Sequence, residues 1–256
     1  MRVGFIGSGS MAAAMARGWA AGEGGPSEML FTDSGSGRAG ELAAEVGGEA
    51  VVSNRELAGR CDLAVLAVKP AALEQVAAEA GAAPAVLSLL GATTLRRVAE
   101  AFPAAAAFRA MPNVAVEVRR GVLCYEAAAS APAETGGRVR EMLGLLGHLV
   151  ETADEDFDAA TAVMGCAPAY LALAVEAISE AGARDGLDPE LSRSLVIETT
   201  AGTAELLRIR HPADVRRAVA SPGGSTEAGL EALDAGGAAE AFAAAVRASL
   251  ERMRRE

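Results

Sequence analysis

The stretch that decides the fold is Met1-Arg2-Val3-Gly4-Phe5-Ile6-Gly7-Ser8-Gly9-Ser10-Met11-Ala12. Its apolar residues 3–6 predict a buried strand, and the alanine-rich residues 11–19 predict a helix. The glycine-rich turn between them lets the backbone approach a pyrophosphate, which the free N–H groups of the helix start attract. Such a turn can also be merely flexible, but the strand before it and the helix after it favour a nucleotide-binding site.

Apolar runs and helical stretches alternate over the rest of the first 152 residues. Further strands are predicted at 28–32, 50–53, 61–68, 85–89 and 106–110, and residues 121–125 and 139–150 complete the domain. Strands that alternate with helices form parallel, doubly wound sheets with right-handed crossovers. We therefore predict an α/β fold, with a Rossmann-type dinucleotide-binding domain over residues 1–152.

From Asp154 onward the pattern becomes entirely helical. The acidic run 154–158 favours a helix start, and long helices are predicted at 170–181, 189–207 and 238–256. A segment of about 100 residues with so apolar a central helix and so few aromatic residues has difficulty burying it alone. We expect residues 153–256 to form an all-helical dimerisation domain that packs against a second subunit. Burial against the chain's own nucleotide domain is the alternative.

Charge and cysteine content limit the classes of partner and the cellular compartment that fit this chain. The formal net charge of −11 argues against nucleic acid and anionic membranes, although a local positive pocket for a phosphate remains compatible with it. Cys61, Cys124 and Cys166 are widely spaced, so neither a disulfide framework nor a metal site is expected. No signal-like start and no uninterrupted apolar run of membrane-spanning length is present. We expect a cytoplasmic protein with a small-molecule substrate.

A second motif, Ser221-Pro222-Gly223-Gly224-Ser225-Thr226, lies between the last predicted helices. Its proline and paired glycines predict a loop, and Ser225 and Thr226 begin the next helix. Free backbone N–H groups and two hydroxyls suit a carboxylate and a neighbouring polar atom. The same residues are preferred helix caps, so a plain N-cap is an equally good interpretation.

Four further elements complete a recognisable series. They are Ala67-Val68-Lys69-Pro70, Arg109-Ala110-Met111-Pro112-Asn113, Pro168-Ala169-Tyr170 and His211-Pro212. In order and spacing, the whole series resembles the pyrroline-5-carboxylate reductase family over nearly the entire chain. The resemblance implies NAD(P)H-dependent reduction of a cyclic imine carboxylate, 1-pyrroline-5-carboxylate, to L-proline. It also implies a homodimer, or a higher homo-oligomer built from dimers, whose active site uses loops from both subunits.

The resemblance also implies the site residues. The cofactor would be held by Gly7, Ser8, Gly9, Ser10, Met11, Ser34, Asn54, Val68, Lys69 and Pro70. Asp33 is a further candidate because of its position at the end of the second predicted strand, not because of the resemblance. The substrate would be held by Ser221, Gly223, Gly224, Ser225 and Thr226, with Thr226 as the catalytic partner of the ring nitrogen. Two of these have simpler interpretations: Asn54 could cap a helix, and Lys69-Pro70 could end a strand with a rigid turn.

The residues around Asp33 leave the choice of cofactor open. An acidic side chain at the end of the second strand binds ribose hydroxyls and repels a 2′-phosphate, which favours NAD(H). The family resemblance, with Ser34 and Arg38 in the same loop, implies NADP(H). Asp33 could instead be a turn residue that points to solvent. We expect NADP(H), with NAD(H) as the alternative because of Asp33.

Departures from the family pattern touch the substrate side. They are Met164-Gly165-Cys166-Ala167, Val114-Ala115, Arg217-Ala218 and Ile209. A reductase of a different cyclic imine and a non-catalytic nucleotide-binding relative therefore remain alternatives. A β-hydroxyacid dehydrogenase shares the layout but uses a lysine in its helical domain, and the only lysine of this chain is Lys69.

Overall fold

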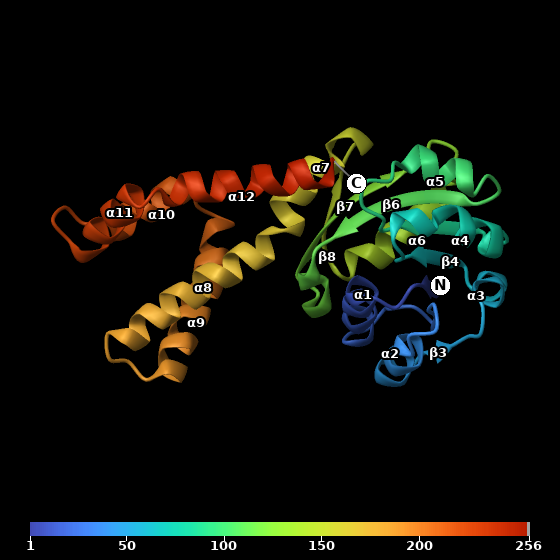
Figure 1. Cartoon of the computed structure of the whole chain (residues 1–256), viewed down its shortest axis with the longest axis horizontal. Helices are drawn as coiled ribbons and strands as arrows, with labels where there is room; N and C mark the ends of the chain where they lie inside the picture. The colour runs from blue at the N-terminus through green and yellow to red at the C-terminus, as the bar shows by residue number, and fades with distance from the viewer. Residues whose placement is uncertain (255–256) are drawn as a thin grey trace. The chain divides into compact units, whose positions relative to one another are not determined.

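The computed structural model describes residues 1–254. The chain forms two compact units, one made of residues 1–166 with residues 250–254, the other of residues 167–249. The first unit contains a sheet flanked by helices, and the second is built of helices (Figure 1). The predicted fold class, a Rossmann-type sheet followed by helices, is confirmed.

The sheet has eight strands in the order β3-β2-β1-β4-β5-β6-β7-β8. All neighbours are parallel except β6 and β7, which are antiparallel. The strands are β1 (Arg2–Ile6), β2 (Glu28–Thr32), β3 (Glu49–Ala50), β4 (Leu63–Leu66), β5 (Ala85–Ser88), β6 (Ala106–Pro112), β7 (Gly121–Ala127) and β8 (Gly147–Glu151). The strand order reverses at β1, which places a crevice at the carboxyl ends of β1 and β4.

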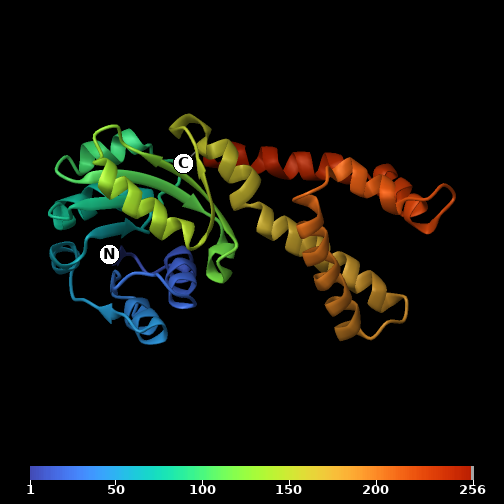
Figure 2. The ribbon, with the colours of Figure 1, turned by 180° about the vertical axis from the view of Figure 1, so that it is seen from behind.

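Helices cover both faces of the sheet. One layer consists of α1 (Ser10–Ala20), α2 (Arg38–Val46) and α6 (Ala133–Gly144), which share a buried cluster with Phe5 and Phe108. The other consists of α3 (Asn54–Arg60), α4 (Leu73–Ala80) and α5 (Leu95–Ala101). Helix α5 lies in front of the sheet in the view of Figure 1, and the yellow-green α6 lies in front of it in the reverse view of Figure 2. Burial on both faces explains why the strands are nearly continuous apolar runs.

Short helices complete the first unit. They are η1 (Pro70–Ala72), η2 (Val114–Val118), η3 (Asp154–Asp156), α7 (Phe157–Ala160) and the π-helical η4 (Thr161–Gly165). The last three lie within the compact unit of the sheet, so this unit extends beyond the point at which the sequence pattern becomes helical.

Two details of the sheet differ from the sequence prediction. The third strand, expected at 50–53, is only Glu49–Ala50, because Ser53 caps α3 and its hydroxyl accepts a hydrogen bond from the Glu56 amide at 3.1 Å. Strand β7 breaks the parallel series because only the short η2 segment joins it to β6. A parallel crossover needs a dozen residues or more. The connection between β6 and β7 is shorter than that, and the two strands therefore pair antiparallel.

The helical unit contains a hairpin and three further helices. The elements are α8 (Ala167–Arg184), α9 (Pro189–Leu207), α10 (Pro212–Val219), α11 (Ser225–Ala235) and α12 (Ala238–Met253), the last as far as Ser249. Helices α8 and α9 approach closely, since a Cβ on Gly182 would lie 2.4 Å from the Ser192 Oγ. That hydroxyl donates to the Ser179 carbonyl at 2.8 Å. Small residues thus hold the hairpin together.

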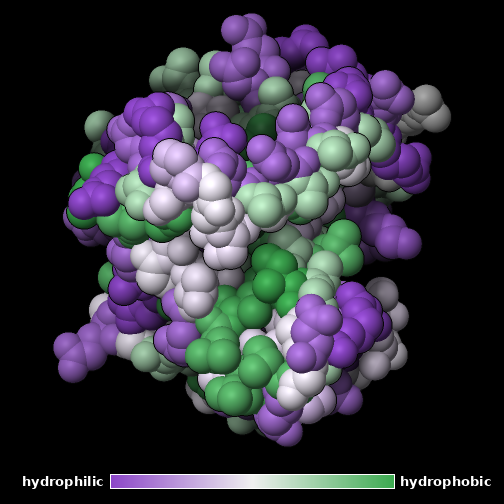
Figure 3. All heavy atoms as spheres, turned by 90° about the vertical axis from the view of Figure 1, so that its left-hand side faces the viewer, coloured by the Kyte–Doolittle hydropathy of each residue, from purple (hydrophilic) through white to green (hydrophobic). Residues whose placement is uncertain are grey.

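Large apolar side chains are exposed on this hairpin. They include Leu171, Leu173, Ile178, Leu191 and Leu195, each at least half exposed. Figure 3 shows hydrophobic residues gathered over the lower part of the face it presents. The helical stretch Asp154–Arg184 is long and apolar enough to cross a membrane by length and composition alone, a test that core helices of soluble proteins also pass. Charged residues such as Glu176 interrupt it.

Candidate active site

A cavity of about 690 Å³ lies where β1, β2 and β4 end. This is the switch point at which open α/β sheets bind their ligands. Most of the predicted cofactor residues line it: Gly7, Ser8, Gly9, Asp33, Ser34, Asn54, Val68 and Lys69. Of the others, Ser10 lines an adjacent groove, Met11 packs against the core, and Pro70 begins η1.

The first glycine of the turn, Gly7, leaves no room for a side chain. Gly7 has φ +96°, and a Cβ there would lie 2.6 Å from the Ala67 carbonyl oxygen. Gly9 is the N-cap of α1, with no side-chain cap on the free amides of the first turn. The Ser8 hydroxyl donates to the Thr32 carbonyl at 3.1 Å and joins the turn to β2. The result is a backbone surface suited to an anion.

The Asp33 carboxylate is bound by the loop that follows it and by the first turn of α2. One oxygen accepts from the Gly35 and Ser36 amides at 2.7 and 3.1 Å, and the other from the Ser36 hydroxyl and the Ala39 amide at 3.0 and 2.8 Å. These bonds, that from Ala39 foremost, lower the pKa of Asp33. Asp33 therefore points neither to bulk solvent nor freely into the cavity; it shapes the loop.

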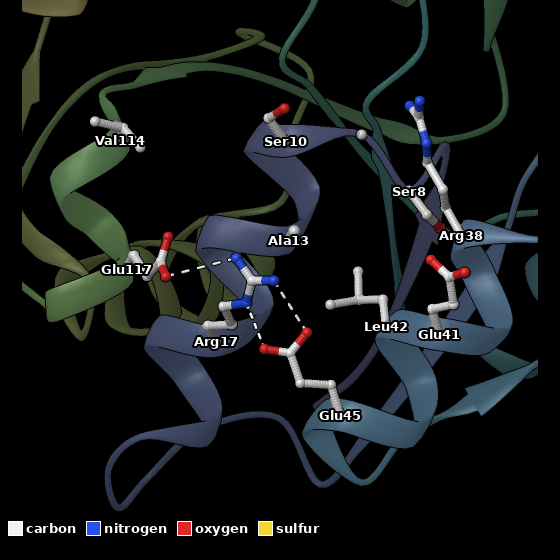
Figure 4. Close-up of a pocket in the computed structure, with 11 residues that line it drawn as sticks. Ser8, Ser10, Ala13, Arg17, Arg38, Glu41, Leu42, Glu45, Val114 and Glu117 are labelled. Carbon is white, nitrogen blue, oxygen red and sulfur yellow. Dashed lines mark hydrogen bonds and ion pairs between the residues drawn. The ribbon is translucent and has the colours of Figure 1, made fainter. Parts of the chain in front are cut away.

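The loop that Asp33 organises presents other groups to the cavity. Ser34, Ser36 and Arg38 are exposed and line it. Arg38 is the first residue of α2, and Figure 4 shows it extending beside Ser8. Hydroxyls and a guanidinium are donors that suit a phosphate.

Asn54 belongs to a row of polar side chains that line the cavity. It does not cap α3, because Ser53 does. Its amide nitrogen donates to a Glu79 oxygen at 2.7 Å, and its amide oxygen accepts from the Thr32 hydroxyl at 2.6 Å. Gln75 donates to the other Glu79 oxygen at 3.0 Å. Thr32, Gln75 and Glu79 all line the cavity, and the sequence prediction missed them.

The adjacent groove lies between α1, α2 and η2 (Figure 4). Arg17 of α1 pairs with Glu45 of α2 at 2.6 Å and with Glu117 of η2 at 3.5 Å. These ion pairs are exposed, so each contributes little to stability. Close packing matters more, because a Cβ on Gly18 would lie 2.1 Å from the Val116 carbonyl oxygen.

The Arg109–Asn113 element holds the segment that follows the sheet. Arg109 is 3% exposed, pairs with Asp154 at 2.5 Å and lies over the Phe157 ring at 4.2 Å. Asn113 donates to the Met164 carbonyl and accepts from the Val122 amide, both at 3.2 Å. Both side chains of this motif therefore have structural partners, which explains the motif without a ligand contact.

The second motif forms an exposed loop in the helical unit. Gly223 has φ +72°, and α11 begins at Ser225, as the sequence predicts. The Glu227 carboxylate accepts from the Gly223 amide at 2.6 Å. Ser221, Gly223, Ser225 and Thr226 are exposed, Gly224 is half-buried, and none of them lines the cavities described above. The two predicted halves of the site therefore belong to different units of the chain, the cofactor residues to the sheet unit and these residues to the helical unit.

Comparison with known proteins identifies both parts of the chain. Residues 154–256 match the family model "pyrroline-5-carboxylate reductase dimerisation", and residues 2–90 match "NADP oxidoreductase coenzyme F420-dependent". A pyrroline-5-carboxylate reductase from Synechocystis is 34% identical over 98% of this chain and 97% of its own length.

Two solved structures are similar over nearly their full length. The pyrroline-5-carboxylate reductase of Streptococcus pyogenes has a TM-score of 0.91 and 27% identity, covering 100% of this chain and 99% of that one. The Plasmodium falciparum pyrroline carboxylate reductase, solved with NADP bound, has a TM-score of 0.88 and 27% identity, covering 100% and 97%.

Proposed function

We propose that this chain uses NADPH to reduce 1-pyrroline-5-carboxylate to L-proline. The chain belongs to the pyrroline-5-carboxylate reductase family. The main support for the proposal is the sequence similarity to reductases over 98% of the chain, which includes both the sheet unit and the helical unit. A family relationship over both units argues against a different dehydrogenase class that shares only the layout.

The cavity residues fit a dinucleotide. The cradle at Gly7 and the free amides of α1 suit a pyrophosphate, and the hydroxyls of Ser34 and Ser36 with Arg38 suit a 2′-phosphate. The Asp33 carboxylate already accepts from four donors of the loop and of the first turn of α2, so this residue no longer favours NAD(H). NADP(H) is the cofactor that these residues favour.

The chain's own contribution to the reaction is positioning. NADPH held by the residues of the cavity would supply the hydride that the imine carbon accepts, with the ring nitrogen protonated. The amides at the start of α11 would hold the substrate carboxylate, and Thr226 would hydrogen-bond the ring nitrogen. Orientation of this kind accounts for a large share of catalysis in cofactor enzymes.

A second copy of the chain completes the site in this proposal. The substrate loop is exposed in the helical unit, and the apolar face of the α8–α9 hairpin needs a cover. We propose that two copies bury these faces against each other, in place of lipid, and that the oligomer is cytoplasmic. The three cysteines are free, which suits a reducing compartment.

The protein is expected to be at least a dimer in solution. Light scattering at micromolar concentration should give at least twice the chain mass of 25.8 kDa. Leu173→Asp, on the exposed apolar face, should lower that mass because a buried unpaired charge is costly. Val52→Asp, on an exposed loop of the sheet unit, is the matched control and should leave the mass unchanged. A stable, active monomer of the wild type would contradict the proposal.

The wild-type protein is expected to prefer NADPH to NADH in kcat/KM. Arg38→Ala should lower kcat/KM for NADPH about tenfold or more, because a charge-assisted hydrogen bond to the 2′-phosphate is lost, and should leave that for NADH nearly unchanged. Arg120→Ala removes a comparable exposed charge outside the cavity and serves as the control. A clear preference of the wild type for NADH would contradict this assignment.

The substrate is tested by comparing cyclic imines. Oxidation of NADPH should be fastest with 1-pyrroline-5-carboxylate and slower with a six-membered imine carboxylate or with a pyrroline that lacks the carboxylate. Faster turnover of either analogue would favour a reductase of another imine. No oxidation with any of them would favour a non-catalytic relative.

A further inference from the structure

The polar row on one wall of the cofactor cavity joins three elements of the fold. Thr32 ends β2, Asn54 begins α3, and Gln75 and Glu79 lie one turn apart on α4. Their hydrogen bonds run from Thr32 to Asn54 at 2.6 Å, from Asn54 to Glu79 at 2.7 Å, and from Gln75 to Glu79 at 3.0 Å. All four side chains line the cavity.

The Glu79 carboxylate fixes which groups donate and which accept in this row of hydrogen bonds. An ionised carboxylate can only accept hydrogen bonds, so the NH2 group of Asn54 must face Glu79 and its carbonyl must face the Thr32 hydroxyl. Hydrogen bonds from Gln75 and then from Asn54 lower the pKa of Glu79, so this carboxyl is ionised at neutral pH. Without Glu79, the Thr32 hydroxyl could donate or accept, and the Asn54 amide could take either orientation.

We infer that Glu79 is a positioning residue for the adenosine half of the cofactor, acting through Asn54. The inference rests on the proposed binding of NADP(H). With its orientation fixed, the Asn54 amide keeps one N–H and one oxygen lone pair that these bonds do not use. Both are then held ready for the ribose or the base, without the entropy loss of ordering a free side chain.

Electrostatics alone predicts the opposite effect, which makes the inference testable. NADPH and its adenosine fragment are strongly anionic, so removal of a nearby carboxylate should tighten their binding. If Glu79 instead positions Asn54, removal of Glu79 should weaken binding. The sign of the change in Kd distinguishes the two.

The experiment measures binding rather than turnover. The Kd of NADPH would be followed by the fluorescence of its dihydronicotinamide, and the Kd of adenosine 2′,5′-bisphosphate by calorimetry, because this fragment reports the adenosine half alone. Glu79→Ala should raise both Kd values about fivefold to twentyfold, since it leaves Asn54 without its acceptor. Glu79→Gln keeps one acceptor oxygen and should stay within about threefold of the wild type.

One control variant and one double variant complete the experiment. Glu74→Ala removes an exposed carboxylate from the same helix outside the cavity and should not raise either Kd. In an Asn54→Ala background, Glu79→Ala should add nothing further, because coupled residues are non-additive. Thermal melts of each variant would verify that it is folded.

The outcomes separate the inference from the proposed function. Unchanged or tighter binding in Glu79→Ala, equal losses in Glu79→Ala and Glu79→Gln, or additive losses in the double variant would each overturn the inference. A folded wild type that binds neither NADPH nor the adenosine fragment would overturn the proposed function instead.

Discussion

Replacement of Thr226 by alanine is expected to lower kcat/KM for 1-pyrroline-5-carboxylate by about ten- to a thousandfold, as loss of one transition-state hydrogen bond does. Thr226 is the second residue of α11 and is exposed on the loop that the family resemblance assigns to the substrate. Its hydroxyl can hydrogen-bond the ring nitrogen as hydride reaches the neighbouring carbon. Steady-state kinetics with varied imine concentration at saturating NADPH measures the effect.

Two controls separate chemistry from folding. Thr226→Ser keeps a hydroxyl and should recover most of the activity. The Kd of NADPH should not change in either variant, because the cofactor cavity lies in the sheet unit and does not include this loop. Unchanged kinetics in Thr226→Ala would remove this residue from the mechanism.

Gly7→Ala is expected to abolish tight cofactor binding and to destabilise the sheet unit. Alanine at φ +96° is strained, and its Cβ would lie 2.6 Å from the Ala67 carbonyl oxygen and 3.1 Å from the Val68 side chain. Strain and overpacking together should lower the free energy of unfolding by about 2–4 kcal/mol. The displaced turn should raise the Kd of NADPH about a hundredfold, since the pyrophosphate loses its fitted backbone surface.

Two other glycines separate strain from cofactor contact. Gly47 also has positive φ but opens on free space, so Gly47→Ala should cost some stability and leave NADPH binding intact. Gly9 has an ordinary φ, and a Cβ there meets no atom of the chain within 4 Å. Gly9→Ala should therefore keep stability yet weaken NADPH binding, because the pyrophosphate would meet the new methyl group. Equal NADPH binding in Gly7→Ala and Gly9→Ala and the wild type would contradict the placement of the cofactor.

Local patterns predicted the elements of the sheet well but not its far edge. The first strand, the glycine turn and α1 follow from residues 3–19, because apolar periodicity and turn chemistry agree there. The reversal at β7 depends on the length of the connection around η2, which is too short for a parallel crossover. That signal was in the sequence, but it is weaker than the alternation of strands and helices around it.

The part of the site that the backbone forms was predictable from the sequence. The part that side chains form was less predictable. The glycine turn carries its own signature, whereas Asp33 allowed three interpretations, and the structure supports a fourth in which its carboxylate binds the amides of its own loop. Glu79 gave no signal, since an acidic residue one turn after Gln75 on a helix is usually a solvated surface pair. Only the juxtaposition of α4 with Asn54 reveals it.

Measurement of NADPH oxidation together with product analysis decides whether this chain is a pyrroline-5-carboxylate reductase. Purified wild-type protein with 1-pyrroline-5-carboxylate should oxidise NADPH and form L-proline in equal molar amounts, and Thr226→Ala should slow both to the same extent. Oxidation without proline, or no reaction from a folded oligomer that binds NADPH, would contradict the assignment of this chain as a pyrroline-5-carboxylate reductase.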